Sequence, residues 1–475
     1  MSTDNPNNGN WIDLPISERR LLMGLGDLLA VNLAVLVALR IWAMVGKLQF
    51  SAGFILGQLH WFIILSLLWL LLAAANDFYN LRMSARWLQS QARLITIQLQ
   101  LLLIYLLIFF LSPRDALPRL FILYYAVVSY ILIALWRLGR PFLARWKALR
   151  QRVLVIGTGW AAQTIVEAIQ THAPDDYEVV GVIDEIGSSE QDGVVIDVPV
   201  IGYRADLVRI AHELHANEIV LATSGEVDGV LFQGIMDCYE AGIPVIPMPI
   251  LYEQFTRMVP VEYVGGHWNV VLPLEGHHHF DPYPLLKRLV DIAISLVGLA
   301  MFGVLLPFVA LAMVIDSPGP IFYRQERVGQ AGRFFNLFKL RTMIPDAEKL
   351  SGPIWAVQDD PRVTLVGRWL RRTRLDEAPQ LINVLRGDMS VIGPRPERPH
   401  FVDYLQKQIP FYRTRLAVRP GLTGWAQVNY GYGSTDTDQL IKLKYDLYYI
   451  RHCSALLDLL ILLRTVGRII RLEGR

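Results

Sequence analysis

Two adjacent carboxylates, Asp376 and Glu377, stand beside a basic run in the last third of the chain, where residues 371–374 read RRTR. On a helix, neighbouring side chains diverge by about 100°. One carboxylate could therefore attack a phosphorus atom while the other holds Mg²⁺ from the side. A carboxylate with its ordinary pKa of about 4 is ionised at neutral pH and needs no general base to act as a nucleophile. The pair suits metal-assisted attack on a diphosphate whose charge is neutralised by metal and by arginine.

Basic residues in loops bounded by glycine and proline recur on both sides of this pair. Arginine binds phosphate oxygens through two parallel N–H donors, so such loops suit a phosphorylated substrate. They are FKLRTM at residues 338–343, DPRVT at 360–364, GDMS at 387–390, GPRPE at 393–397 and RPGLTGWAQ at 419–427. Any one of them fits a solvated face or a lipid-headgroup surface equally well, but their number in this short region favours a binding site.

Asp376 has a second interpretation, as the cap of a helix. Aspartate is favoured at the residue before the first helical turn. Pro379 would stand in that turn, and an apolar run follows at residues 381–385. The pattern Asp-Glu-x-Pro alone favours this interpretation. The two roles are compatible, because a helix N-terminus also attracts an anionic phosphate.

The composition of the 475-residue chain indicates a membrane protein. It is 53% hydrophobic and only 19% charged, whereas soluble domains are about a quarter charged. The formal net charge is +2. The chain therefore lacks the basic field that nucleic-acid binding requires, and we expect no nucleic acid among its partners.

Four apolar stretches fill the first third of the chain. Each has about the length of a helix that crosses a bilayer, about 20 residues. They run from Leu21 to Ile41, from Phe54 to Ala75, from Leu94 to Leu111 and from Leu120 to Leu138. Basic residues gather between the second and third stretches and after the fourth, so the N-terminus and everything after residue 140 are expected in the cytoplasm. Residues 1–145 are predicted as a four-helix transmembrane bundle whose interior Asp27 and Asn32 face. A buried soluble bundle is the alternative.

Residues 150–262 have the pattern of a Rossmann-like cytoplasmic domain. Short apolar runs at 153–156, 179–183, 218–222 and 243–246 alternate with helical stretches, which predicts a parallel α/β sheet. The loop at residues 157–159, Gly-Thr-Gly, would bring a helix N-terminus close to a phosphate, and Asp184 stands where a ribose-binding acid belongs. One such loop is compatible with a nucleotide site, a regulatory site or no ligand at all.

A fifth apolar run, from Leu289 to Ile315, contains Pro307. Basic residues flank both of its ends, which favours the same side of the membrane for both. Proline lacks an amide hydrogen and clashes with the preceding helical turn, so Pro307 is expected to break the helix where a turn is needed. A re-entrant hairpin that enters and leaves on the cytoplasmic side fits best, and an ordinary fifth span is the alternative.

The last part of the chain, residues 280–475, strongly resembles the polyprenyl-phosphate hexose-1-phosphate transferases, which are monotopic phosphoglycosyl transferases. The resemblance rests on the segment with Pro307 and on KLRTM at 339–343, LDEAPQ at 375–380, NVLRGDMS at 383–390, GPRP at 393–396, RPGLTGWAQ at 419–427 and YDLYY at 445–449. It implies a membrane α plus α/β fold, in which a re-entrant helix carries a small α/β catalytic domain. Four preceding spans and a Rossmann-like domain resemble the large members that initiate exopolysaccharide or O-antigen (lipopolysaccharide) synthesis.

The resemblance also implies a chemistry. Asp376 would attack the β-phosphorus of a UDP-hexose, with glucose favoured and galactose next, and release UMP. The phosphosugar would then pass from the aspartate to undecaprenyl phosphate, while Glu377 binds Mg²⁺. The residues implied to line the site or hold substrate are Lys339, Arg341, Arg371, Pro394, Arg395, Pro396 and Asp446. The family further implies a multi-pass protein of the bacterial inner membrane, with its catalytic domain on the cytoplasmic face of the lipid bilayer, and a homodimer.

The chain departs from the family pattern at Arg374, where many members have serine, and at Ala378, where leucine is commoner. Two rival functions stay open beside the transferase. Tyr283 and Lys287 have the spacing of short-chain dehydrogenases, although Pro284 follows the tyrosine. A nucleotide-sugar epimerase or dehydratase that uses the loop at Gly157 would predict bound NAD. A membrane scaffold without enzymatic activity would predict no UMP release.

Overall fold

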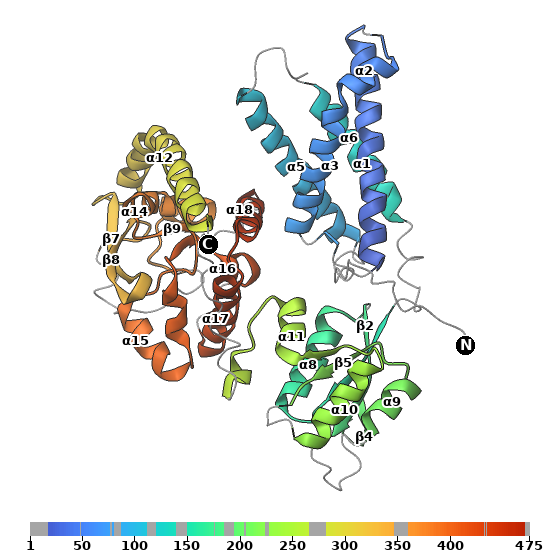
Figure 1. Ribbon diagram of the computed structural model, residues 1–475. Helices are drawn as coiled ribbons and strands as arrows, with labels where there is room; N and C mark the ends of the chain where they lie inside the picture. The colour runs from blue at the N-terminus through green and yellow to red at the C-terminus, as the bar shows by residue number, and fades with distance from the viewer. Residues whose placement is uncertain are drawn as a thin grey trace. The chain divides into compact units, whose positions relative to one another are not determined.

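The computed structural model describes residues 18–47, 49–76, 78–79, 87–111, 120–138, 150–174, 176–184, 194–203, 206–223, 228–265, 282–345, 360–431, 433 and 435–470. The chain divides into two compact units, Met1–Arg150 and Gln151–Arg475. Their helices and strands are drawn in Figure 1.

The first unit is helical (Figure 1). Its helices are α1 (Glu18–Val45), α2 (Ala52–Gly57), α3 (Leu59–Ala75), α5 (Trp87–Leu111) and α6 (Phe121–Leu138). The four long helices occupy the predicted spans, and each packs against two of the others, which makes a bundle. Met23–Val45 and Phe121–Leu138 are long and apolar enough to cross a membrane, whereas Leu59–Ala75 is apolar but shorter. The number of crossings and their orientation stay predictions. The predicted orientation rests partly on basic residues that lie outside the described residues, such as Arg82, Arg86 and Arg140.

Polar side chains of α1 face the interior of this bundle, as predicted. Asp27 is fully buried, and its Oδ2 lies 2.5 Å from Nη2 of Arg137 in α6. Arg137 also donates to the carbonyl of Phe78, and Asn32 donates to the hydroxyl of Ser66 at 3.0 Å. A buried charge is destabilising unless it is paired and hydrogen-bonded. The pair therefore explains how α1 tolerates an aspartate inside the bundle.

The second unit begins with a six-stranded sheet. Its strands are β1 (Gln151–Ile156), β2 (Tyr177–Asp184), β3 (Val194–Val195), β4 (Val198–Tyr203), β5 (Glu218–Leu221) and β6 (Val245–Pro247). They lie in the order β3-β4-β2-β1-β5-β6, and every pairing except β3 with β4 is parallel. The predicted parallel α/β sheet is confirmed.

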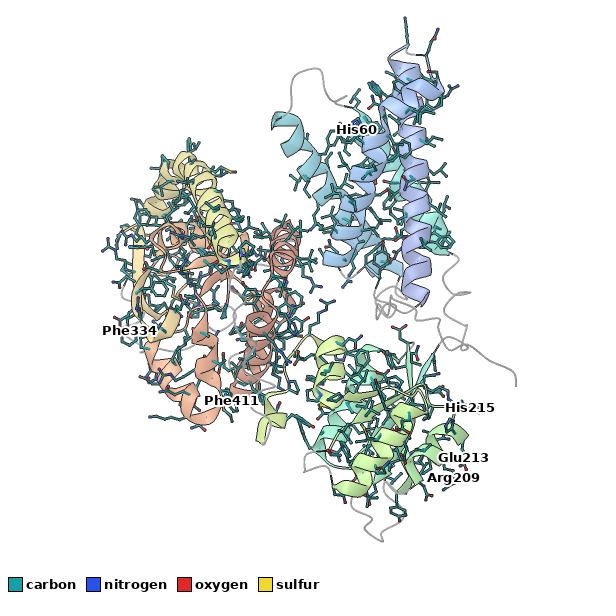
Figure 2. The ribbon with its side chains drawn as sticks, in the orientation of Figure 1. His60, Arg209, Glu213, His215, Phe334 and Phe411 are labelled. Carbon is teal, nitrogen blue, oxygen red and sulfur yellow. The ribbon has the colours of Figure 1, made fainter. Side chains whose placement is uncertain are left out.

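Helices cover both faces of this sheet. They are α8 (Trp160–His172), α9 (Leu207–Glu213), α10 (Gly229–Glu240) and α11 (Met248–Thr256), followed by the 3₁₀ helix η3 (Val261–Gly265). α8 and α11 pack on the face with Val153 and Val155, and α9 and α10 on the face with Leu154 and Ile156. The outward side of α9 carries the exposed ion pair of Arg209 and Glu213, 2.9 Å apart (Figure 2). Such pairs contribute little to stability, so this one marks the solvated side of the helix.

The strand order reverses at β1, because β2 lies on one side of it and β5 on the other. Gly157 follows β1 directly and has φ of +115°. A Cβ at this position would lie 2.6 Å from the carbonyl oxygen of Ala222. Only glycine accommodates both conditions, so the turn into α8 depends on it. Asp184 is buried at the end of β2.

The rest of the second unit is a mainly helical domain with two small sheets. Its helices are α12 (Tyr283–Asp316), α13 (Leu365–Thr373), η6 (Leu375–Gln380), α14 (Leu381–Arg386), α15 (Pro399–Gln408), η7 (Tyr412–Ala417), α16 (Trp425–Asn429), α17 (Asp436–Arg451) and α18 (Ala455–Ile470), with η5 (Gln330–Gly332) between the strands of a hairpin. The strands are β7 (Phe322–Val328), β8 (Phe334–Leu340), β9 (Ser390–Ile392) and β10 (Gly421–Thr423). β7 pairs antiparallel with β8, and β9 parallel with β10. The core gathers Met389, Trp425, Leu447 and Ile461, and Val259 after α11 joins it.

The helix break predicted at Pro307 is wrong, because the apolar helix α12 runs through this residue as one helix of 34 residues. Its ribbon is bent instead (Figure 1). Near one end, Arg288 donates to the carbonyls of Val384 and Leu385 at 2.7 and 2.8 Å. At the other end, Asp316 accepts from the amide of Val366 at 2.8 Å. Both ends are thus fastened to helices that flank η6, α14 on one side and α13 on the other.

Candidate active site

The acidic pair lies in η6, a 3₁₀ helix between α13 and α14. Thr364 caps α13 by accepting from the amide of Gly367 at 3.0 Å. Arg374 ends α13 in the left-handed conformation, with φ of 56°. Asp376 and Glu377 follow, each with only 8% of its surface exposed. The acidic pair is therefore held on a buried turn between two helices.

The helix-cap interpretation of Asp376 is wrong. Arg374 and Gln380 hold the capping positions of η6 and α14, and neither helix has a side-chain cap. Asp376 sits inside η6, not in front of a helix. The pattern Asp-Glu-x-Pro gave a wrong prediction of the helix start, because Pro379 stands inside the 3₁₀ helix and α14 begins only at Leu381. The aspartate has no capping role that would account for its burial.

Glu377 is surrounded by basic side chains. Its Oε1 lies 2.5 Å from Nη2 of Arg395 and 3.4 Å from Nζ of Lys339, and its Oε2 lies 3.7 Å from Nη1 of Arg374. Burial alone would raise the pKa of Glu377, but the charges of Arg395 and Lys339 outweigh it and lower the pKa well below its usual range. Glu377 is an anion throughout the physiological pH range.

Asp376 has the opposite electrostatic character. Burial, together with the neighbouring charge of Glu377, raises the pKa of Asp376 to about 6. The charges of Lys339, Arg371 and Arg395 act against this rise. Asp376 is consequently ionised at neutral pH but easily protonated just below it. A buried carboxylate that is ionised at neutral pH is suited to attack an electrophile.

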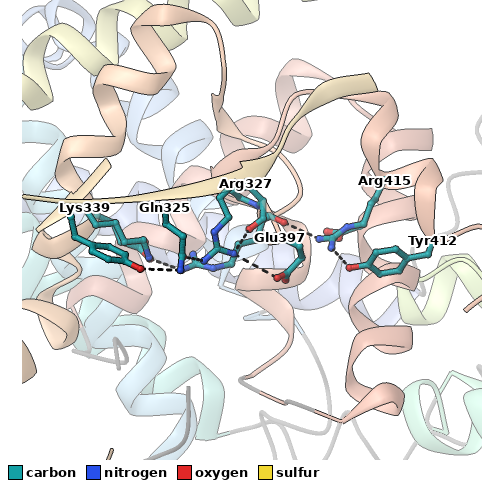
Figure 3. Close-up of polar contacts among 11 residues, drawn as sticks. Gln325, Arg327, Lys339, Glu397, Tyr412 and Arg415 are labelled. Atoms are coloured by element: carbon teal, nitrogen blue, oxygen red, sulfur yellow. Dashed lines mark hydrogen bonds and ion pairs between the residues drawn. The ribbon is translucent and has the colours of Figure 1, made fainter. Parts of the chain in front are cut away.

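The Pro394–Pro396 loop brings Arg395 to this pair. It follows β9, and its backbone is fixed by the amide of Gly421, which donates to the carbonyl of Pro394 at 2.8 Å. Gly393 enters the loop so close to the next strand that a Cβ would lie 2.4 Å from the carbonyl oxygen of Arg419. Arg415 and Arg327 donate to the next two carbonyls of the loop, those of Arg395 and Pro396 (Figure 3).

The other predicted site residues divide into two groups. Arg371 is close enough to influence Asp376 electrostatically, and its Nε donates to Thr342 at 2.9 Å. Arg341 instead fastens the end of α12, because it donates to the carbonyl of Pro320 and to both oxygens of Ser317. Asp446 is buried, and its Oδ2 accepts from Arg415 at 2.8 Å. The structure therefore gathers Lys339, Arg371 and Arg395 around the acidic pair. Arg341 instead contacts the end of α12, and Asp446 contacts Arg415.

Three arginines at the site were not predicted as site residues. Arg374 contacts Glu377. It was noted as part of the basic run beside the pair and as a departure from the family pattern, but was not assigned to the site. Arg327 and Arg415 contact the Pro394–Pro396 loop from β7 and η7. No local motif marks these two, because the residues they contact lie far away in the sequence. The only sign of them in the sequence was that each arginine lies in a segment that also contains apolar core residues.

The donor set suits Mg²⁺. Within the described part of the chain, no group of three or more Asp, Glu, His or Cys residues could hold a metal ion. Mg²⁺ does not need such a group, because it is commonly bound by one or two carboxylates, with water and substrate phosphates as its other ligands. The carboxylate of Glu377 is of this kind. Zinc, which prefers four protein ligands including nitrogen or sulfur in structural sites, fits less well.

Two family models match the chain. The model described as bacterial sugar transferase matches residues 282–472, which contain α12, η6 and the Pro394–Pro396 loop. The model described as CoA-binding domain matches residues 74–232, which contain most of the parallel sheet.

Curated relatives carry matching names. The UDP-N-acetylgalactosamine-undecaprenyl-phosphate N-acetylgalactosaminephosphotransferase of Aeromonas hydrophila is 40% identical over 235 residues, 49% of this chain and 54% of the relative. The undecaprenyl-phosphate glucose phosphotransferase of Komagataeibacter xylinus is 35% identical over 68% of this chain and 59% of the relative. The chain thus spans between a half and two thirds of the length of these two proteins. The UDP-glucose:undecaprenyl-phosphate glucose-1-phosphate transferase of Escherichia coli (strain K12) is 32% identical over 76% of this chain and 77% of the relative. With its sugar-transferase segment and the acidic pair that segment contains, the chain belongs to the bacterial sugar transferases of the polyprenyl-phosphate hexose-1-phosphate transferase family.

Proposed function

We propose that this enzyme transfers hexose-1-phosphate from a UDP-hexose to undecaprenyl phosphate through a covalent intermediate on Asp376. The observation that carries the proposal is the buried acidic pair inside a group of basic side chains. Asp376 keeps a pKa of about 6, while Glu377 is held as an anion by Arg395 and Lys339. Two neighbouring carboxylates in such different states suit different roles, one reactive and one binding.

The first half of the reaction attaches the sugar phosphate to the enzyme. A carboxylate oxygen of Asp376 forms a bond to the β-phosphorus of the UDP-hexose. The bond between that phosphorus and the bridging oxygen breaks, and UMP leaves with the oxygen and its electron pair. Arg395, Lys339 and Arg371 neutralise charge on the diphosphate, which lowers the barrier for attack by an anion.

The second half releases the product to the lipid. A phosphate oxygen of undecaprenyl phosphate attacks the same phosphorus, and the bond to Asp376 breaks. The products are undecaprenyl-diphospho-hexose and the original carboxylate, so the aspartate returns unchanged after each cycle. Mg²⁺ bound by Glu377 and the substrate phosphates would supply further charge neutralisation.

The bent helix α12 is a reason to propose a lipid substrate. It is the longest apolar helix that the structure describes, and only 11% of its most apolar stretch of 18 residues is buried. Both ends are fastened beside η6. We infer that α12 enters and leaves the bilayer on the cytoplasmic face as a re-entrant helix. In this arrangement, a lipid phosphate at the membrane surface and a nucleotide sugar in the cytoplasm would both reach Asp376.

The choice of hexose rests on relatives. Several are named for UDP-glucose, including those of Escherichia coli and Klebsiella pneumoniae. The Aeromonas hydrophila relative is named for UDP-N-acetylgalactosamine. We propose glucose first and galactose next, with an N-acetylated sugar as a competitor in the test. The reaction would be the first membrane step of exopolysaccharide or O-antigen synthesis in the bacterial inner membrane, and the enzyme would act as a homodimer.

The test is UMP release by the full-length protein in detergent with undecaprenyl phosphate, Mg²⁺ and a panel of UDP-glucose, UDP-galactose and UDP-N-acetylgalactosamine. We expect release with one sugar and a lipid product containing that sugar. A matched reaction without undecaprenyl phosphate should give at most one UMP per active site, because the aspartyl intermediate cannot turn over. Absence of release with every sugar would contradict the proposal and favour a scaffold. NAD bound to the purified protein would favour an epimerase or dehydratase.

A further inference from the structure

Two arginines hold the Pro394–Pro396 loop from different elements (Figure 3). From β7, Arg327 donates through Nη1 to the carbonyl of Pro396 at 2.9 Å. Its guanidinium also lies 3.7 Å from the carboxylate of Glu397, and Nη2 donates to Gln325 at 2.6 Å. One side chain therefore links the hairpin of β7 and β8 to the end of the loop.

From η7, Arg415 reaches the preceding residue of the loop. Its Nη2 donates to the carbonyl of Arg395 at 3.0 Å and to Asp446 at 2.8 Å, and its Nη1 donates to the hydroxyl of Tyr412 at 2.6 Å. Only 7% of the arginine and 2% of Asp446 are exposed. A guanidinium that satisfies three partners at once has a fixed orientation, because its donors form a rigid plane.

These contacts fall on consecutive carbonyls, those of Arg395 and Pro396. Proline on both sides of Arg395 already restricts the φ angles of the loop. With two successive peptide groups also fixed, the backbone of Arg395 has little freedom to rotate. The fixed backbone therefore sets the direction in which the side chain of Arg395 leaves the loop. That side chain contacts Glu377 at 2.5 Å.

We propose that Arg327 and Arg415 are positioning residues that set the direction of Arg395 toward the acidic pair. Neither is proposed to touch substrate; Arg415 is buried, and both donate to the backbone of the loop. The role of Asp446 becomes that of an anchor for Arg415. The inference rests on the proposed function, in that Arg395 binds the diphosphate of the UDP-hexose.

The test replaces each arginine with lysine. Lysine keeps the positive charge beside Glu397 or Asp446, but a single ammonium group cannot reproduce the planar fork. We expect Arg327→Lys and Arg415→Lys to lower kcat/KM for the UDP-hexose by about tenfold to a hundredfold, because displacement of a catalytic group by about 1 Å has an effect of this size. Arg468→Lys is the matched control, since Arg468 also donates to a backbone carbonyl of this domain, that of Gln427 at 2.7 Å. It should retain wild-type kinetics.

A double-mutant cycle separates positioning from a general loss of structure. If both arginines act through Arg395, their substitution should change kcat/KM by less than about twofold in an Arg395→Ala background, because interacting residues are not additive. The same cycle on the Kd of UDP gives the result without turnover. Equal losses in both backgrounds, or unchanged kinetics in the single variants, would overturn the inference. If Arg415→Lys does not fold, the Arg327→Lys cycle decides alone.

The two proposals fail in different ways. Wild-type protein that releases no UMP contradicts the proposed function. Wild-type protein that is active while the cycles show no coupling to Arg395 contradicts only the positioning role.

Discussion

Nη2 of Arg395 lies 2.5 Å from Oε1 of Glu377, so an ion pair joins the Pro394–Pro396 loop to η6. The pair joins residues 18 positions apart and leaves the arginine side chain 31% exposed. Without substrate, the arginine neutralises Glu377. In the proposed reaction the same guanidinium would bind the diphosphate, so the ion pair would keep the arginine in place before substrate binds.

Replacing Asp376 with asparagine should abolish turnover with the fold intact. Asparagine has nearly the same shape but cannot attack phosphorus as an anion, so we expect a loss of about a thousandfold or more in UMP release. The thermal midpoint of unfolding, measured in the same detergent, serves as the check on folding. Normal activity in this variant would refute the nucleophile assignment.

Replacing Arg395 with alanine should weaken the use of UDP-hexose. Hydrogen bonds to charged groups contribute about 1.5–3 kcal/mol, which corresponds to a loss of about tenfold to a hundredfold in kcat/KM. Initial rates are measured while the UDP-hexose concentration is varied at saturating undecaprenyl phosphate. Arg209→Ala on α9 is the control, because that arginine forms an exposed pair in the α/β domain. Unchanged kinetics for Arg395→Ala would remove it from the site.

The pH dependence of the first half-reaction should follow Asp376. Its pKa is raised to about 6, so the reactive anion is lost as pH falls through that value. Below about pH 6, kcat/KM for the UDP-hexose should drop tenfold per pH unit. Since the charge of Lys339 lowers the pKa of Asp376, Lys339→Met should move the inflection to higher pH. An inflection that stays in place in this variant would speak against the assignment of Asp376.

Replacing Asp446 with alanine should destabilise the protein. The substitution leaves Arg415 buried without its carboxylate, and breaking a buried ion pair on one side lowers the free energy of unfolding by about 3–5 kcal/mol. The measurement is the thermal midpoint in detergent. A companion variant, Asp403→Ala, removes an exposed carboxylate on α15 and should leave the midpoint unchanged. An unchanged midpoint for Asp446→Ala would point to direct substrate contact instead of support.

If α12 is re-entrant, as proposed, both of its flanks are accessible from the cytoplasm. Single cysteines at Leu285 and Glu326, both exposed positions, are placed in a background in which Cys238 and Cys453 are serine. A membrane-impermeant maleimide should label both in inside-out vesicles and neither in right-side-out vesicles. Labelling of the two positions from opposite sides would establish an ordinary span.

Local patterns predicted those parts of the structure that depend on near neighbours in sequence. The parallel strands were readable because Val153–Ile156 and the similar runs are short, apolar and followed by turn residues. The association of Lys339 and Arg395 with the acidic pair came from the family resemblance, and contacts confirm that they meet at Glu377. The interpretation of Asp376 as a helix cap was wrong. Whether the chain forms an α-helix or a 3₁₀ helix after Arg374 depends on packing against β8 and α12.

Longer-range relationships were beyond the reach of sequence patterns. Arg415 and Asp446 are 31 residues apart and lie on different helices, so neither has a local feature that identifies its partner. The same is true of Arg327, which is 69 residues from Pro396. Such contacts arise only when the strands and helices have packed, and a single sequence holds no direct record of them.

The two fastenings of α12 also restrict how this helix can change in evolution or by engineering. Each inserted or deleted residue rotates the following part of a helix by about 100° and shifts it by about 1.5 Å. An insertion anywhere between Arg288 and Asp316 would therefore turn one of them away from its partner beside η6. Exchange of α12 between relatives should succeed only when length and helical phase are both conserved. The length of the helix is thus fixed by its two attachment points on the catalytic domain.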